Sequence, residues 1–131
     1  MIALSVGAVL VVGARQQAVA IGVGGLKLMG ADGVPLGSVT CGLIGNPVSP
    51  YGSRISDRSI WNPIGKYGSE ISDTSAYSRI ASKPPALFNA NGDLVAYVTL
   101  SLIMIPRVSP KRVEAYLIEH CDRDDGYRDR Y

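Results

Sequence analysis

Two stretches of this chain alternate apolar and turn-forming residues in the manner of β-hairpins. In the first, the apolar residues of 26–29 and 34–39 flank the turn Gly30-Ala31-Asp32-Gly33. Asp-Gly is a favoured pair in tight turns, because glycine readily adopts a positive φ. Pro35 has no backbone N–H, so we expect it on an edge strand or at a bulge.

The second hairpin signal follows about sixty residues later. Residues 86–89 and the β-rich run 94–102 flank Ala90-Asn91-Gly92-Asp93. At a constant offset, Asp32-Gly33 falls on Asn91-Gly92, and Leu28 and Val39 fall on Leu87 and Val98. The pattern therefore predicts a pseudo-symmetric sheet made of two related hairpins.

The segment between the hairpins, residues 46–85, repeats itself every sixteen residues. Units 46–61 and 62–77 align without a gap, and each carries Asn-Pro, Tyr-Gly-Ser and Ile-Ser-Asp at the same places. A third copy starts at Ser78 and stops at Pro84-Pro85. A fixed period of this kind indicates supersecondary units stacked on one another.

The repeats consist of turn formers and hydroxyl groups. Ser and Asp side chains can accept hydrogen bonds from nearby backbone N–H groups, which would order an irregular segment. A disordered Ser/Gly/Pro linker is the alternative. We expect order, with periodic large residues anchoring the segment in a core: Tyr51, Ile55, Trp61, Tyr67, Ile71, Tyr77 and Ile80.

A single helix is predicted near the C-terminus. Ser109 is a suitable N-cap with Pro110 at the first helical position, and Val113 and Leu117 begin an apolar face that extends to Cys121. The charged residues 122–131 are predicted to form a flexible tail. The fold class that follows is mainly β, a small α+β domain over residues 21–121.

Residues 1–20 differ from the rest of the chain. The apolar run 2–12, followed by Ala18-Val19-Ala20, is typical of a signal peptide and is too short to span a bilayer comfortably. No Lys or Arg precedes the run, and a buried Val- and Ala-rich strand is the alternative. The signal-peptide interpretation predicts export to the periplasm, the cell surface or the medium.

The two cysteines could form one bridge in an oxidising compartment. Cys41 and Cys121 would close a long loop. Alternatively, each is a small buried apolar residue or a free thiol.

Length, composition and charge limit the classes of function that the sequence supports. The 131 residues form one domain by the usual prior, with 47% hydrophobic residues and a net charge of +2. Basic and acidic residues are interspersed, so nucleic acid is not an expected partner. The sequence shows no motif for a cofactor, and we expect neither a transmembrane span nor catalysis.

The order of these elements resembles a widespread family of small, mostly exported bacterial proteins that carry tandem Asn-Pro-x-Gly-x-Tyr-Gly-Ser-x-x-Ser repeats between two β-hairpins. The resemblance covers residues 25–119 and rests on the repeat stretch 59–85 and on the segment 106–110 before the helix. It implies export and carries no activity with it. This chain departs from the pattern at four positions that are commonly aromatic: Ile55, Ile64, Ile71 and Ile80.

Our first hypothesis is a non-catalytic structural or binding module at the cell envelope, with a glycan or a protein as its partner. Flat amphipathic rings can stack on such ligands while their polar tips stay wet. The repeats supply four rings for this role: Tyr51, Trp61, Tyr67 and Tyr77. The competing interpretation is that all four pin the repeats to the core.

Two further classes of function are weaker alternatives. Asp57 and Asp73, each beside serine hydroxyls, could bind calcium, although one carboxylate per repeat is few for a six- to eight-ligand ion. A cysteine-dependent enzyme would need Cys41 or Cys121 to meet His120, the only histidine.

Overall fold

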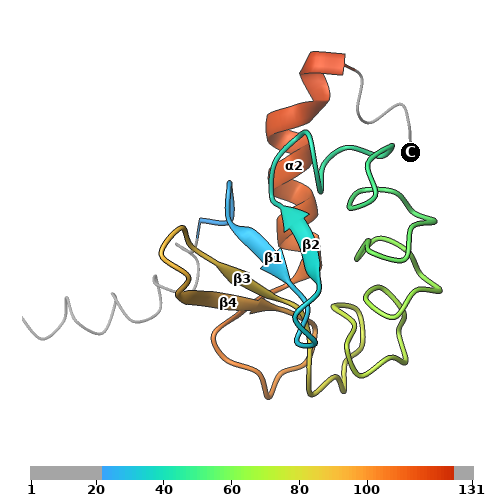
Figure 1. The fold of residues 1–131 in the computed structure, drawn as a ribbon, viewed down its shortest axis with the longest axis vertical. Helices are drawn as coiled ribbons and strands as arrows, with labels where there is room; N and C mark the ends of the chain where they lie inside the picture. Colours follow the sequence, from blue (N-terminus) through green and yellow to red (C-terminus); the bar gives the residue numbers. More distant parts are fainter. Residues whose placement is uncertain (1–21, 126–131) are drawn as a thin grey trace, which may run out of the picture.

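The computed structural model describes residues 22–125, which form one five-stranded sheet, one helix and a long coil (Figure 1). The strands are β1 (Lys27–Met29), β2 (Pro35–Ser38), β3 (Ala86–Phe88), β4 (Leu94–Val98) and β5 (Arg107–Val108), and the helix is α2 (Pro110–Asp125). The sheet order is β2-β1-β3-β4-β5. The predicted class, mainly β with one C-terminal helix, is confirmed.

The two hairpins have the same geometry and meet at a pseudo-two-fold axis. Gly33 and Gly92 both have φ of 86°, the positive value that the predicted turns require. β1 pairs antiparallel with β3, and Leu28 lies directly opposite Leu87, its equivalent in the other hairpin. Both side chains are buried, so the symmetry axis passes through the core. Pro35 lies on the edge strand β2, as predicted.

Strand β4 is shorter than the predicted run 94–102. It ends at Val98, after which the Thr99 hydroxyl accepts a hydrogen bond from the Ser101 N–H at 2.9 Å. A side chain that binds the backbone locally in this way competes with the sheet ladder. The chain then returns as β5, which pairs in parallel with β4.

Helix α2 begins as predicted and runs further. The Ser109 hydroxyl accepts a hydrogen bond from the Arg112 N–H at 3.1 Å, which caps the helix. Val113, Leu117 and Cys121 face the core. The helix continues to Asp125, four residues into the stretch predicted as a tail, and no Gly or Pro interrupts residues 111–125.

The repeat segment forms an ordered coil of linked turns, which we call the repeat coil (residues 46–80). Ten side-chain oxygens each accept a hydrogen bond from the backbone N–H two residues later, at 2.9–3.3 Å. The acceptors recur mostly every third residue: Asn46, Ser49, Ser53, Ser56, Ser59, Asn62, Ser69, Ser72, Ser75 and Ser78. The repeats are therefore a series of Ser and Asn turns rather than a linker.

Some of the same side chains also link one turn of the coil to the preceding one. Ser49, Ser56 and Ser72 each donate a hydroxyl hydrogen bond to the carbonyl six residues earlier, and the Asn62 amide does likewise to Ser56. The two Tyr-Gly-Ser glycines lie where the coil is tightest. A Cβ on Gly52 would collide with the Asn46 carbonyl oxygen, and one on Gly68 would collide with that of Asn62.

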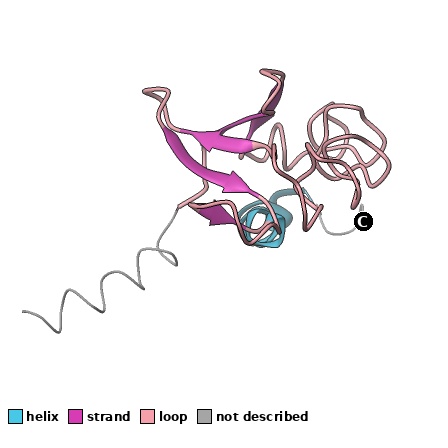
Figure 2. Ribbon diagram, turned by 90° about the horizontal axis from the view of Figure 1, so that it is seen from below, coloured by secondary structure: helices cyan, strands magenta, loops and turns pink. Residues whose placement is uncertain are grey.

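The coil lies alongside α2, and both are seen nearly end-on in Figure 2. The apolar residues of the coil alternate between an inward and an outward set, each spaced by seven or nine residues in turn. The inward residues, buried or packed against the core, are Tyr51, Ile60, Tyr67 and Ala76, and Ile44, just before the coil, continues the set. Outward residues, 76–91% exposed, are Val48, Ile55, Ile64, Ile71 and Ile80. The coil therefore completes a turn about every eight residues, and the sixteen-residue repeat spans two turns.

This alternation corrects one prediction. Ile55, Ile71 and Ile80 do not anchor the repeats, because they are 88%, 87% and 79% exposed. The aliphatic residue of the first repeat that enters the core is Ile60, at 1% exposure. The aromatic anchors behave as predicted, since Tyr67 and Trp61 belong to the core cluster and Tyr51 and Tyr77 pack against it.

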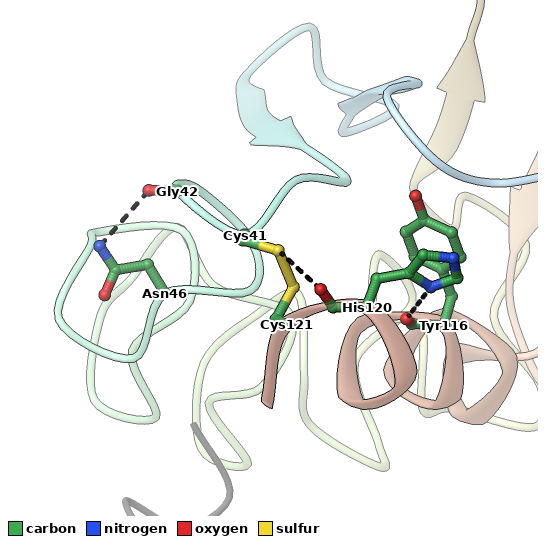
Figure 3. Close-up of a disulfide and its surroundings, with 6 residues drawn as sticks. All are labelled: Cys41, Gly42, Asn46, Tyr116, His120 and Cys121. Carbon is green, nitrogen blue, oxygen red and sulfur yellow. Dashed lines mark hydrogen bonds between the residues drawn. A yellow bond between two sulfur atoms is a disulfide. The ribbon is translucent and has the colours of Figure 1, made fainter. Parts of the chain in front are cut away.

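A disulfide joins the entrance of the coil to the end of the helix (Figure 3). Cys41 follows the first hairpin, Cys121 lies on α2, and 80 residues separate them in sequence. The bridge therefore encloses the repeat coil, the second hairpin, β5 and most of α2 in one covalent loop, and the first hairpin lies outside it. In the chain-entropy model, a loop of this length stabilises the fold by about 4.5 kcal/mol.

Tyr67→Ala should lower the free energy of unfolding by about 3 kcal/mol, because it removes a fully buried aromatic ring from the core. Ile71→Ala, an outward residue of the same repeat, should change it by less than about 0.5 kcal/mol. Urea unfolding of both variants measures the difference. Equal midpoints for Tyr67→Ala and the wild type would show that the coil is not part of the cooperative domain.

Reduction of the disulfide should also destabilise the protein, by about 4.5 kcal/mol at most. The measurement is urea unfolding with and without a phosphine reductant. The Cys41→Ala/Cys121→Ala variant is the control: it should match the reduced wild type and should not respond to the reductant. An unchanged unfolding curve after complete reduction would contradict the assignment of this constraint.

Candidate functional site

The four aromatic rings that the sequence singled out do not form one exposed surface. Tyr67 is 2% and Trp61 9% exposed, and Tyr51 and Tyr77 are partly buried. The Trp61 Nε1–H donates to the Ile44 carbonyl at 3.0 Å. Only Trp61 and Tyr77 approach each other, edge to face, with ring centroids 6.5 Å apart.

These two rings line a pocket of about 330 Å³ between the repeat coil and α2. We call it the aromatic pocket. Its walls combine the rings with two cations, two carboxylates and close-packed backbone: Arg54, Trp61, Pro63, Gly68, Glu70, Tyr77, Lys111 and Glu114. The volume is at the lower end of the range for small-molecule sites.

The electrostatics of the pocket are balanced. Burial raises the pKa of Tyr77 to about 12, and the Glu114 carboxylate adds to the shift while Arg54 opposes it. The phenol therefore remains protonated at any physiological pH and can donate a hydrogen bond. With Arg54 and Lys111 against Glu70 and Glu114, the lining carries as many positive as negative groups. Such a pocket suits a neutral ligand rich in hydroxyl groups.

Two exposed apolar surfaces lie outside the pocket. The first is the outward row of the coil, defined as Val48, Ile55, Ile64, Ile71 and Ile80. The second is the loop between β4 and β5, where Leu102, Ile103 and Ile105 are 73–77% exposed. In that loop, the Arg107 guanidinium donates to the carbonyls of Leu102 and Met104 at 3.2 and 3.4 Å.

A polar cluster joins the first hairpin to the coil. The Tyr67 hydroxyl donates to Asp32 at 2.8 Å, and the Lys66 ammonium lies 3.1 Å from the same carboxylate oxygen. Burial raises the pKa of Asp32, but the hydrogen bonds from Tyr67, Lys66 and the Val34 N–H outweigh it and hold the pKa below its usual value. The cluster therefore holds the coil against the first hairpin.

The predicted calcium ligands are not brought together. Within residues 22–125, no three acidic, histidine or cysteine side chains are grouped as a metal ion would need. Asp73 accepts hydrogen bonds from the Ser82 N–H and hydroxyl, both at 2.7 Å, so its carboxylate closes the end of the coil. Asp57 is exposed on the preceding repeat.

The cysteine chemistry considered from the sequence has no nucleophile here, since both sulfur atoms are in the disulfide. His120 lies beside the bridge, but its ring stacks on Tyr116 at 4.0 Å and its Nδ1 is 2.8 Å from the Tyr116 carbonyl (Figure 3). The His120 ring therefore supports the local helix geometry.

No family model, curated protein or solved structure matches the chain. Among residues 22–125, no helix has both the length and the apolar character needed to cross a bilayer. The predicted signal peptide falls on residues 1–20, which lie outside the described part.

Sequence reasoning named only Trp61 and Tyr77 among the eight residues that line the aromatic pocket. Lys111 and Glu114 come from α2, more than thirty residues after Tyr77, and no local pattern links them to the repeats. The outward row carried a signal, because the isoleucines recur at equivalent repeat positions. A sixteen-residue period does not reveal which aliphatic residue faces inward, and for this reason the core prediction for Ile55, Ile71 and Ile80 is wrong.

The Asp32 carboxylate should make stability depend on pH on the acid side. Its folded pKa is depressed, so its contribution is complete above the unfolded value, near 3.8, and is lost as the pH falls through the folded value. Asp32→Asn should be less stable than the wild type at pH 7 and should lose less stability on acidification. Tyr67→Phe, which removes one donor and keeps the carboxylate, should show a smaller change. Thermal melts from pH 7 to about pH 2 test this, and parallel curves for Asp32→Asn and the wild type would refute it.

Proposed function

We propose that this protein is a non-catalytic binding module that is exported to the cell envelope and that holds a glycan in the aromatic pocket. The single observation that carries the proposal is the composition of that pocket, in which Trp61 and Tyr77 stand beside balanced cations and carboxylates. Aromatic rings provide flat apolar area for the C–H faces of a sugar. Carboxylates accept hydrogen bonds from sugar hydroxyls, and Arg, Lys and the protonated Tyr77 donate to them.

The disulfide bond supports the proposal of export. A disulfide between Cys41 and Cys121 persists in an oxidising compartment and is rare in the cytosol. A small domain of this size benefits from such a bridge, because its core alone buries limited apolar surface. The apolar run at residues 2–12 supports the same proposal from the sequence.

The rigidity of the coil supports binding rather than catalysis. In the pocket wall contributed by the repeats, the buried Ser59 and Ser75 hydroxyls hold the backbone N–H groups of Trp61 and Tyr77, so the ligand would meet a preformed surface. Preformed sites lose less entropy on binding than flexible ones. The groups in the pocket are positioned to hold hydroxyls, and no activated nucleophile stands among the lining residues.

The test is retention on peptidoglycan and on a panel of immobilised neutral glycans. The pair Lys111→Ala/Glu114→Gln removes one cation and one anion from α2 without disturbing the core, and should lower affinity at least about 10-fold. Trp61 is a core residue, so its substitution would confound binding with folding. Arg58→Ala and Glu119→Gln, exposed on the same two elements, are the matched controls and should bind as the wild type does. Equal retention of the wild type and the pocket variant, or no retention on any glycan, would end the proposal.

A further inference from the structure

The outward row is unusual for a single folded domain. Five aliphatic side chains, all 76–91% exposed, recur at equivalent places along a rigid coil. Figures 1 and 2 show the side of the coil remote from α2 uncovered by any other described segment. Scattered exposed apolar residues are ordinary, but an ordered series on one face marks an interaction surface.

The area of the outward row matches what a stable interface needs. Each exposed Ile or Val side chain offers on the order of 100 Å² of apolar surface, so the row offers on the order of 500 Å². A standard interface removes about 800 Å² from each partner, of which somewhat more than half is apolar. The row alone therefore supplies the apolar part of one side of such an interface.

The spacing of the row makes it nearly self-complementary. Val48 and Ile80 each stand sixteen residues from Ile64, and Ile55 and Ile71 stand nine and seven residues from it. A two-fold axis through Ile64 therefore places Val48 of one copy against Ile80 of the other, and Ile55 against Ile71. Isologous contacts of this kind need one patch that complements itself.

The charges beside the row favour the same arrangement. Arg54 precedes Ile55, and Glu70 occupies the equivalent position before Ile71. Antiparallel packing of two copies brings an arginine of one toward a glutamate of the other at both ends, whereas parallel packing in register brings like charges together.

We propose that the outward row is a self-association surface on which a second copy of this chain packs antiparallel, with Ile64 at the two-fold axis. Arg54 and Glu70 also line the aromatic pocket, but none of the five residues of the outward row does, so a substitution at Ile64 tests self-association without changing the pocket lining and either proposal can fail alone. Dimerisation presents two pockets on one particle, and a paired module binds a polymeric ligand by avidity.

The first experiment measures the mass of the full chain by sedimentation equilibrium over about 1 µM to 1 mM. The wild type should dimerise, and Ile64→Lys, which places two like charges at the axis, should raise the dimer Kd at least about 100-fold. Ile64→Leu should preserve the dimer. Ile103→Lys, in the other exposed apolar loop, is the matched control and should also preserve it. A wild type that remains monomeric throughout, or a dimer insensitive to Ile64→Lys, overturns the proposal.

The second experiment tests the register by cross-linking. Under mild oxidation Ile64→Cys should form covalent homodimers, while Val48→Cys and Ile80→Cys should cross-link with each other and not with themselves. Self-cross-linking of Val48→Cys with no mixed product contradicts the antiparallel arrangement. Neutral lipid vesicles are the competing partner: retention of the monomer on vesicles that Ile64→Lys abolishes would assign the row to a membrane surface and overturn self-association.

Discussion

The requirement that buried backbone polar groups find hydrogen-bond partners governs this structure. A segment of some thirty-five residues lies against the core in neither a regular helix nor a sheet, so its N–H and C=O groups lack a ladder. Side-chain oxygens of Ser and Asn, recurring mostly every third residue, replace that ladder together with backbone turn hydrogen bonds such as that from the Asn62 N–H to the Ser59 carbonyl. Buried Ser59 and Ser75 show the consequence, because each holds the N–H of an aromatic residue that enters or borders the core. The hydroxyls of the repeat are therefore structural groups, and their number says nothing about catalysis.

The coil also explains why the repeat is sixteen residues long. One turn of about eight residues carries one inward and one outward apolar residue, and two turns are needed before the Tyr-Gly-Ser step recurs. Tyr67 and Ile71 stand four residues apart and face opposite sides. The inward residues that pack the coil against the core therefore also fix the orientation of the outward row. A scaffold of this kind presents side chains at regular positions without the conformational freedom of a loop.

Much of the fold was predictable because its signals are local. The turns at Gly33 and Gly92, the edge position of Pro35 and the cap at Ser109 each depend on a few neighbouring residues, and all occur as expected. What could not be predicted depends on tertiary contacts. Residues far apart in sequence meet in three places. β1 pairs with β3, the Leu100 N–H donates to the Ala76 carbonyl where β4 ends early, and Glu114 lies near Tyr77. Which residues of the coil face inward also depends on tertiary contacts. Ile55 and Ile60 are equally apolar, and only packing decides which one is buried.

The end of the coil shows how the repeats are terminated and why two full copies suffice. Asp73 repeats the position of Asp57, but only Asp73 has a serine nine residues later, and its carboxylate takes both the N–H and the hydroxyl of Ser82. Pro84 and Pro85 follow, buried, and Val98 donates its N–H to the Pro85 carbonyl, so the coil leads directly into the second hairpin.

At its other end the coil starts five residues after Cys41, which is joined by the disulfide to Cys121 near the end of α2. Both ends are thus fixed to the sheet and helix, and the length of the coil is set by the distance between two attachment points. Adding a repeat would require a longer α2 beside it, because the inward residues of the new turns would otherwise have no core to enter.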